Sequence, residues 1–205
     1  MQQHLNKIDT INLGSYYTPR FIVEIAYQIL ESKIENLNNF LFFDSSCGYG
    51  DFFVKKYKYL GADIDEVALK KVDQSIKTIN TNSLLNVSRA KFNIDENQNL
   101  IVNNSIKKEV FKMDSKLVHR DLGISFLRSF AILKAKYVCV LHPLSYLIKQ
   151  ANFNALFDFK SNYRLLDCLV ISSAFFTNSK TFFPIAIALY EKNNKICYPY
   201  NRKEN

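Results

Sequence analysis

Apolar residues follow two different spacings along this chain. Over Phe21–Lys33 they recur every three or four positions, which predicts a helix with Thr18 as its N-cap and Pro19 as its first residue. Short and wholly apolar runs predict buried strands instead. The strands expected on this basis are Phe40–Phe43, Leu60–Ile64, Tyr137–Leu141, Leu166–Ile171 and Phe183–Tyr190, with further strand-and-turn candidates at Thr78–Leu85 and Asn99–Val102.

Helical spacing separates most of these runs. Further helices are expected over Glu66–Ile76, Leu117–Ala135 and Leu144–Phe157. Strands that alternate with helices predict an α/β fold, a doubly wound and mostly parallel twisted sheet with helices on both faces. Because the 205 residues contain no internal repeat and no linker, we expect residues 1–205 to form a single domain.

Composition narrows the class of protein only a little. The net charge of +8 favours a polyanionic partner, although a lysine-rich proteome would give the same surplus. The apolar runs are too short to span a membrane, and Met1–His4 shows no secretory signal. The four cysteines are far apart without a Cys-x-x-Cys pair, so we expect a reducing cytoplasm and neither a disulfide framework nor a metal site.

The residues after the first strand carry the strongest chemical signal. Asp44 ends that strand, and Gly48 and Gly50 follow in a tight turn where a ligand could approach the backbone closely. Ligands bind at the carboxyl ends of strands in open α/β sheets. The third glycine of the dinucleotide fingerprint and the lysine of a phosphate-binding loop are both missing. The alternative is an ordinary turn between a strand and a helix, without a role in ligand binding.

An acidic residue also ends the second strand. Asp63 lies in the run Gly61–Asp65, where a carboxylate can accept both hydrogen bonds of a ribose diol. The alternative is that Asp63 or Asp65 caps the helix that begins near Glu66. Asp65 suits the cap, which leaves Asp63 for a ribose.

In their order along the chain, these motifs resemble DNA adenine-N6 methyltransferases, in particular the short type II restriction–modification enzymes of the HhaII kind. The segments that carry the similarity cover nearly the whole chain: Gly14–Pro19, Asp44–Gly50, Gly61–Asp65, His119–Ile124, Val140–Leu147 and Ser179–Pro184. The resemblance implies a Rossmann-like, S-adenosylmethionine-dependent methyltransferase in the bacterial cytoplasm. It further implies duplex DNA as substrate, at a short site such as GANTC, a cognate restriction endonuclease as genetic partner, and allows a homodimer.

The resemblance also assigns roles to single positions. Its cofactor site comprises Tyr16, Tyr17, Thr18, Pro19, Asp44, Cys47, Gly48, Gly50, Asp63, Ile64 and Asn82. Asn82 stands where an aspartate that reads the adenine ring is usual, and Ser45 stands where proline is usual. Phe182 or Phe183 matches the aromatic residue that stacks on the extruded base, with core phenylalanines of a strand as the alternative.

The catalytic tetrapeptide of these enzymes, Asn/Asp-Pro-Pro-Tyr/Phe after the fourth strand, does not occur in this sequence. Asn103 is a weak match to its first residue, and an ordinary turn residue is the alternative. The resemblance therefore identifies no catalytic residue.

Two connections are also shorter than the fold requires. Ten residues, Asp51–Leu60, separate Gly50 from Gly61, whereas a crossover between parallel strands needs about a dozen or more. We hypothesise that residues of the natural protein are absent from this sequence near Phe53–Lys56 and near Leu100–Val102. The rival hypothesis is a genuine deletion that leaves a catalytically inactive protein.

Contacts with DNA are expected from a basic stretch. Lys107, Lys108 and Arg120 flank the presumed catalytic loop and would contact the DNA backbone, with a solvated helix face as the alternative. No separate target-recognition domain is evident. The leading interpretation is a site-specific DNA adenine methyltransferase. The alternatives are an inactive, methyltransferase-like DNA-binding or partner subunit, and an enzyme that methylates RNA or protein.

Overall fold

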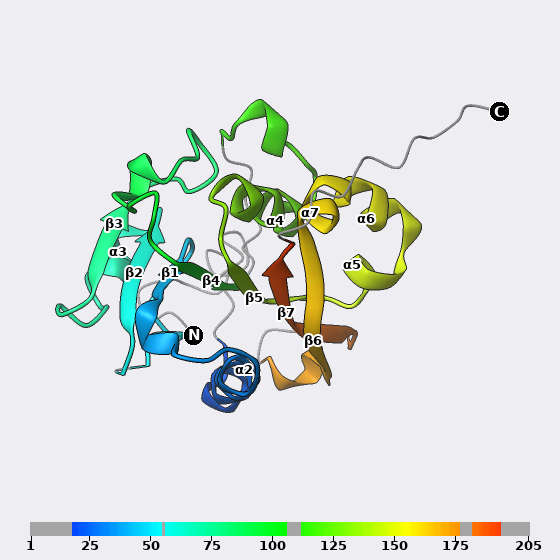
Figure 1. Cartoon of the computed structure of the whole chain (residues 1–205), viewed down its shortest axis with the longest axis horizontal. Coiled ribbons are helices and arrows are strands. Elements are labelled where there is room, and N and C mark those ends of the chain that lie inside the picture. Colours follow the sequence, from blue (N-terminus) through cyan, green and yellow to red (C-terminus); the bar gives the residue numbers. More distant parts are fainter. Residues whose placement is uncertain (1–17, 55, 106–111, 177–181, 194–205) are drawn as a thin grey trace.

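The fold is built on one seven-stranded sheet, seen in a computed structural model that describes residues 18–54, 56–105, 112–176 and 182–193 (Figure 1). The strands are β1 (Leu41–Asp44), β2 (Lys58–Asp63), β3 (Lys77–Asn80), β4 (Leu100–Ser105), β5 (Tyr137–Pro143), β6 (Tyr163–Ser172) and β7 (Pro184–Lys192). The α-helices are α2 (Arg20–Lys33), α3 (Glu66–Leu69), α4 (Leu122–Ile132), α5 (Ser145–Ile148), α6 (Gln150–Ala155) and α7 (Phe157–Asn162). Short 3-10 turns are η1 (Leu37–Asn39), η2 (Ala90–Phe92), η3 (Ser115–Leu117) and η4 (Ser173–Phe175).

The strand order is β3-β2-β1-β4-β5-β7-β6. All neighbours pair in parallel except at β7, which is antiparallel to both β5 and β6. From β1 the chain builds outwards to β2 and β3, and then returns to place β4 on the other side of β1. The strand order thus reverses between β1 and β4, and in sheets of this kind ligands bind beyond the carboxyl ends of the strands at such a point. The predicted doubly wound, mostly parallel sheet is confirmed.

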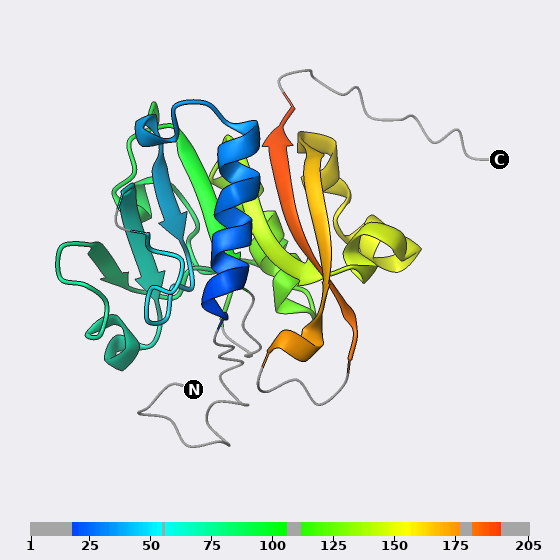
Figure 2. The same ribbon diagram turned by 90° about the horizontal axis from the view of Figure 1, so that it is seen from below.

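Each face of the sheet is covered by its own apolar layer. Helix α2 lies across one face, where Ala26 and Leu30 pack against Phe42 and Ile187 (Figure 2). The other face is covered by α4 and α7, with Phe130 and Phe159 in the larger cluster. Helices on both faces are thus confirmed. Within the described ranges, no helix combines the length and the apolarity needed to cross a membrane.

The start of α2 differs from its prediction. Pro19 is the N-cap rather than the first helical residue, because its ψ of 140° is extended. Its carbonyl accepts hydrogen bonds from the backbone N–H of Ile22 at 2.9 Å and of Val23 at 3.3 Å. Thr18 therefore lies one residue outside the helix, and the prediction that it is the N-cap is wrong.

Three other predicted helices are shorter than their apolar spacing suggests. The helix expected over Glu66–Ile76 ends at Leu69, and the one expected from Leu117 begins at Leu122, where the side chain of Asp121 accepts a hydrogen bond from Gly123. The segment Leu144–Phe157 forms separate short helices, because Lys149 is extended. Apolar spacing thus did not show where these helices begin and end.

The two short connections differ in what surrounds them. No helix lies among the described residues between β1 and β2, and the backbone N–H of Tyr57 donates to the Val54 carbonyl at 3.3 Å. Residues Leu100–Val102 form the first half of β4, each paired in register with β1. The hypothesis of missing stretches and its rival, a genuine deletion, stay predictions.

Candidate functional site

The turn after β1 is held by Asp44 and shaped by two glycines. The carboxylate of Asp44 is 3% exposed and accepts a hydrogen bond from the Ser46 backbone N–H at 3.0 Å. Gly48 and Gly50 have φ values of 53° and 80°, the left-handed region that favours glycine. A Cβ on Gly50 would also lie 2.6 Å from the ring of Phe53. Both effects disfavour a side chain at Gly50.

Asp63 connects this turn to the end of β2. One carboxylate oxygen accepts a hydrogen bond from the Gly48 N–H at 2.7 Å, and the other accepts one from the Asp65 N–H at 2.9 Å. The side chain of Asp65 accepts a hydrogen bond from the Ala68 N–H at 3.0 Å, which confirms Asp65 as the cap of α3. Each carboxylate oxygen can accept more than one hydrogen bond. Asp63 therefore orients the glycine turn and retains the chemistry to bind a diol.

Gly61 lets the turn pack closely on β2. It pairs with Asp44 in the parallel register of β1 and β2. A Cβ on Gly61 would lie 2.8 Å from the Sγ of Cys47 and 3.0 Å from the ring of Phe53. Cys47 is 5% exposed, and its side chain thus packs over Gly61. Ile64, the next residue after Asp63, is 41% exposed at the rim of the same site.

The N-terminal motif reaches the glycine turn through Thr18. Thr18 is buried, and burial raises the pKa of the Asp51 carboxyl, whereas a hydrogen bond to the Thr18 backbone lowers it. This contact places Thr18 and Pro19 beside the residues that follow Gly50. The structure thus joins two of the motifs that the sequence separates by about thirty positions. Tyr16 and Tyr17 lie outside the described residues.

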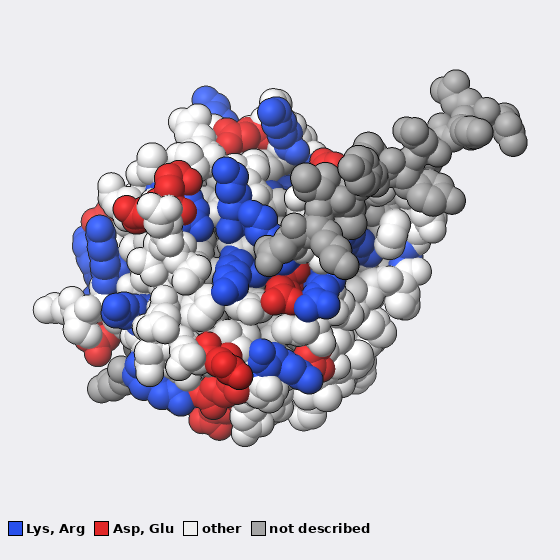
Figure 3. Space-filling model, in the orientation of Figure 1, with Lys and Arg blue, Asp and Glu red and all other residues white. Residues whose placement is uncertain are grey.

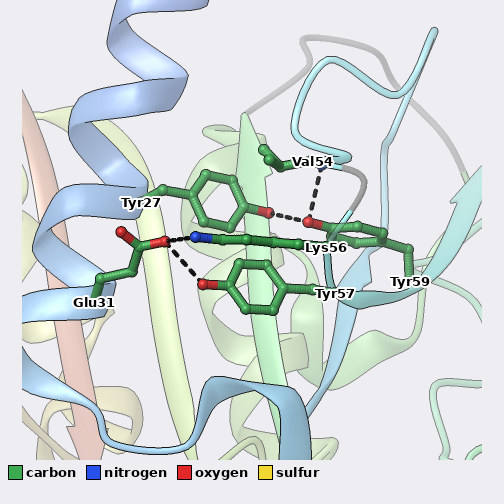
Figure 4. A network of polar contacts seen from close by, with 6 residues as sticks. All are labelled: Tyr27, Glu31, Val54, Lys56, Tyr57 and Tyr59. Carbon is green, nitrogen blue, oxygen red and sulfur yellow. Dashed lines mark hydrogen bonds and ion pairs between the residues drawn. The ribbon is translucent and has the colours of Figure 1, made fainter.

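A cluster of tyrosines fastens the β1–β2 connection to α2 (Figure 4). The hydroxyl of Tyr27 donates to the Phe52 carbonyl at 2.6 Å and lies 3.1 Å from the Tyr59 hydroxyl. The Tyr59 hydroxyl accepts a hydrogen bond from the Val54 N–H at 2.9 Å, and burial raises its pKa to about 12. These contacts fix the loop where a crossover helix was expected. They could not be expected from the sequence, because tyrosines in an apolar pattern give no sign of hydrogen bonds between distant segments.

The outer part of the same cluster is an ion pair with an aromatic partner. The carboxylate of Glu31 lies 2.5 Å from the Lys56 ammonium and accepts a hydrogen bond from the Tyr57 hydroxyl at 2.8 Å. These two hydrogen bonds lower the pKa of Glu31. Because the pair is exposed to solvent, it contributes little to stability by itself.

Asn82 holds two strand-end loops together. Its amide nitrogen donates to the Lys112 carbonyl at 2.6 Å, and its amide oxygen accepts a hydrogen bond from the Leu84 N–H at 3.0 Å. An aspartate, the usual residue here by resemblance, could not donate to the Lys112 carbonyl. The departure at position 82 is therefore explained by a link between the loop after β3 and the segment that precedes α4.

Asn103 occupies a different place from the one expected. It lies inside β4, paired in register with Cys139, and is 2% exposed rather than in a turn after the strand. Neither its amide nitrogen nor its amide oxygen has a hydrogen-bond partner in the described part of the chain. The side chain lies close enough to Tyr27 to lower the pKa of that hydroxyl, which burial raises. A turn role for Asn103 is wrong, and its catalytic role stays a prediction.

His142 ends β5 within a buried polar network. Its ring nitrogens lie 2.8 Å from the Tyr190 hydroxyl and 2.9 Å from the Pro143 carbonyl. Its ring stacks on Tyr146, whose hydroxyl donates to Asp121 at 2.5 Å. Burial lowers the pKa of His142 to about 4. The end of β5 therefore holds a neutral imidazole at physiological pH.

Phe182 and Phe183 precede β7 and are not core residues. Phe182 is 78% exposed and Phe183 is 43% exposed, so their interpretation as core phenylalanines of a strand is wrong. Because β7 is antiparallel to β5, with Ile185 opposite Pro143, its first residues lie at the carboxyl end of β5. The two rings are thus at the same edge of the sheet as Asp44 and Asp63.

The predicted DNA-backbone residues are only partly described. Arg120 is exposed before α4, whereas Lys107 and Lys108 lie outside the described residues. On the face shown in Figure 3, basic and acidic side chains are interspersed, so the positive surplus forms no single patch there. Among the described residues, no group of three or more histidine, cysteine or acidic side chains could hold a metal ion.

Comparison with known proteins gives a family match and structural neighbours. The family model described as N-6 DNA methylase matches residues 3–119. A modification subunit of a putative type I restriction enzyme from Vibrio vulnificus has a TM-score of 0.67 at 12% identity, with 87% of this chain and 45% of that chain covered. No curated protein matches the chain.

Two further structural neighbours are described as methyltransferases. A putative class I S-adenosylmethionine-dependent methyltransferase from Listeria monocytogenes has a TM-score of 0.65 at 14% identity, with 97% of this chain and 66% of that chain covered. A putative RNA methyltransferase from Pyrococcus horikoshii has a TM-score of 0.61 at 14% identity, with 89% and 88% covered. At these identities the likeness shows the fold, that of S-adenosylmethionine-dependent methyltransferases. The chain spans about half the length of the Vibrio subunit.

Proposed function

The chain belongs to the N-6 DNA methylase family, and from this premise we propose that it transfers a methyl group from S-adenosylmethionine to N6 of adenine in duplex DNA. The observation that carries the proposal is the bond from the Gly48 N–H to the Asp63 carboxylate, 2.7 Å long. It joins the glycine turn to the acidic end of β2, beside the point where the strand order reverses between β1 and β4. The family and the fold both indicate S-adenosylmethionine as the cofactor.

The residues at this site fit that cofactor. Asp63 has the acceptors for the ribose diol, the Gly48–Gly50 backbone leaves room for close approach, and Ile64 offers an apolar contact to the adenine ring. Thr18 and Pro19 lie beside Asp51, where the methionine end would extend. When bound, S-adenosylmethionine supplies a methyl group already activated by its sulfonium charge. The contribution of the chain is then to orient the donor and to exclude water.

The proposal includes the context of the reaction. Phe182 or Phe183 stacks on the extruded adenine, and Lys107, Lys108 and Arg120 contact the DNA backbone. The chain acts as a single domain in the bacterial cytoplasm and protects a short site, such as GANTC, from a cognate endonuclease, as short type II modification enzymes of the HhaII kind do. Two of the structural neighbours are methyltransferase subunits of type I systems, one of them putative, which supports the restriction–modification setting.

A second function is favoured by the sequence after β4. Asn103-Asn104-Ser105 ends that strand, and no Asn/Asp-Pro-Pro follows anywhere in the chain. Without that motif, nothing identified in the chain accepts the hydrogens of the adenine amine. The second candidate is therefore a catalytically inactive protein that binds S-adenosylmethionine and serves as a DNA-binding or partner subunit.

One experiment separates the two candidates. The purified chain is incubated with methyl-labelled S-adenosylmethionine and DNA that lacks adenine methylation, and the label in N6-methyladenine is counted. Label above that of the Asp63→Ala variant supports the enzyme. Cofactor binding by calorimetry without label supports the inactive subunit, and no cofactor binding contradicts both.

A further inference from the structure

We propose that four exposed phenylalanines beside the site form a stacking surface for unpaired nucleobases. The aromatic rim, as we name it, consists of Phe21, Phe175, Phe182 and Phe183, which are 43%, 51%, 78% and 43% exposed. Only Phe182 and Phe183 were expected to contact a base, and Phe21 was expected on the buried face of its helix. The inference rests on the proposed function, because it concerns how the same site holds its DNA.

The four rings come from three elements that contact one another. The rings of Phe21, in the first turn of α2, and Phe175, in η4, are 5.3 Å apart between centroids and meet edge to face. The backbone N–H of Ser173 donates to the Phe183 carbonyl at 2.9 Å, and the Phe183 N–H donates to the Ser173 hydroxyl at 3.0 Å. The rim is therefore a connected surface held by backbone hydrogen bonds.

The aromatic rim lies at the functional edge of the sheet. Strand β6 leads into η4, and β7 begins after Phe183, so both junctions fall at the carboxyl ends of the parallel strands. Figure 2 shows η4 beside the first turn of α2 at this same end of the molecule. The rim thus lies at the same edge of the sheet as the glycine turn.

The chemistry of the rim favours a base over other occupants. Single exposed apolar residues are ordinary, whereas a contiguous group marks a binding surface. All four side chains are flat rings without polar atoms, and aromatic rings of this kind stack on any base without regard to sequence. An extruded adenine leaves its partner base and its neighbours unstacked. The net charge of +8 attracts the polyanion that carries them.

The test compares DNA probes that differ only in one unpaired base. Fluorescence anisotropy gives the Kd of the full-length chain for a fully paired duplex and for the same duplex with one bulged 2-aminopurine, whose fluorescence falls on stacking. We expect Phe175→Ala and Phe21→Ala each to weaken binding to the bulged probe by about tenfold, with less than about twofold change on the paired probe. The fluorescence decrease should be lost in parallel.

Matched variants separate stacking from general apolar contact. Phe175→Tyr retains a ring and should bind like the wild type, whereas Phe175→Leu should behave like Phe175→Ala. Phe157→Ala is the control on α7, because Phe157 is 50% exposed but belongs to another element. Unchanged S-adenosylmethionine affinity shows that each variant is folded.

Two results would overturn the inference while leaving the proposed function in place. One is wild-type DNA binding that both alanine variants retain on every probe, which would assign the rim to a protein partner. The other is an equal loss on paired and bulged probes. A wild-type chain that binds S-adenosylmethionine but neither DNA probe would overturn the inference and DNA as the substrate together.

Discussion

The ends of β1 and β2 differ from the matching ends of β4, β5 and β7 in which of their side chains have partners within the protein. At the first two, the buried carboxylates of Asp44 and Asp63 accept hydrogen bonds from the backbone of the turns beside them. In β4 the Asn103 amide is buried without a partner in the described part of the chain, although His142 in β5 has partners for both ring nitrogens. Phe182 is left mostly in solvent. We call these regions the donor half and the acceptor half.

The difference indicates when each half completes its contacts. The donor half is already organised, because the turn that receives a ligand is fixed by bonds within the chain. A buried amide without a hydrogen-bond partner is costly, and a group of exposed aromatic rings is unusual on a surface that contacts only water. We therefore expect the acceptor half to gain contacts on binding, whereas the donor half should bind with little rearrangement.

The largest effect is expected from Asp63→Ala in the donor half. The change removes two hydrogen bonds to a buried carboxylate and leaves the Gly48 N–H unpaired, which should lower the free energy of unfolding by about 4 kcal/mol. Calorimetry should show the affinity for S-adenosylmethionine reduced by at least about 100-fold, since the ribose acceptor is lost as well.

Asp95→Ala provides the matched control for this change. Its carboxylate also accepts a backbone hydrogen bond two residues on, from Asn97 at 2.7 Å, but in an exposed turn. We expect a small loss of stability and unchanged cofactor affinity. Equal losses of affinity in the two variants would contradict the assignment of the donor half.

The second effect concerns pH and the buried histidine of the acceptor half. The pKa of His142 in the folded chain is about 4, below its ordinary value of 6.5. Between these two pH values the imidazole is therefore protonated in the unfolded chain and neutral in the folded chain. The contribution of neutral His142 to the free energy of unfolding is fully present above pH 6.5. It is lost as the pH falls towards 4, by about 3 kcal/mol in all. Urea unfolding of the wild type and of His142→Gln should show this extra slope only in the wild type. Parallel slopes would show that folding does not shift the pKa of His142.

The donor half was largely predictable from the sequence, and the acceptor half was not. Asp44, Gly48 and Asp63 lie where a local pattern of strand, acid and glycine places them, because each depends on residues close in sequence. The exposure of Phe182, the burial of Asn103 and the partners of His142 depend on strand pairings between distant segments. The capping residues that shortened the helices, such as Asp121, were equally invisible to apolar spacing.

A third and smaller effect is expected from Asn103→Leu. Leucine has nearly the same shape as asparagine but no polar atoms, so the change removes a buried amide that lacks partners among the described residues. The free energy of unfolding should rise by about 2 kcal/mol, measured by urea denaturation. If Asn103 has the catalytic role, methyl transfer is abolished while the protein becomes more stable. A destabilised variant would show that the amide is paired in solution and would weaken the contrast between the halves.

The smallest effect should come from Tyr27→Phe, which tests whether the tyrosine cluster organises the donor half. The change removes the hydroxyl that donates to the Phe52 carbonyl at 2.6 Å and contacts Tyr59. We expect a loss of about 1 kcal/mol in stability and about threefold in S-adenosylmethionine affinity, because the loop after the glycine turn is less well held. Tyr163→Phe is the matched control, since its buried hydroxyl donates to the Ala135 carbonyl at 2.7 Å on the other face of the sheet. Its loss of stability should be similar with no change in affinity. If both variants bind S-adenosylmethionine as the wild type does, the tyrosine cluster does not organise the glycine turn and only packs the β1–β2 connection against α2.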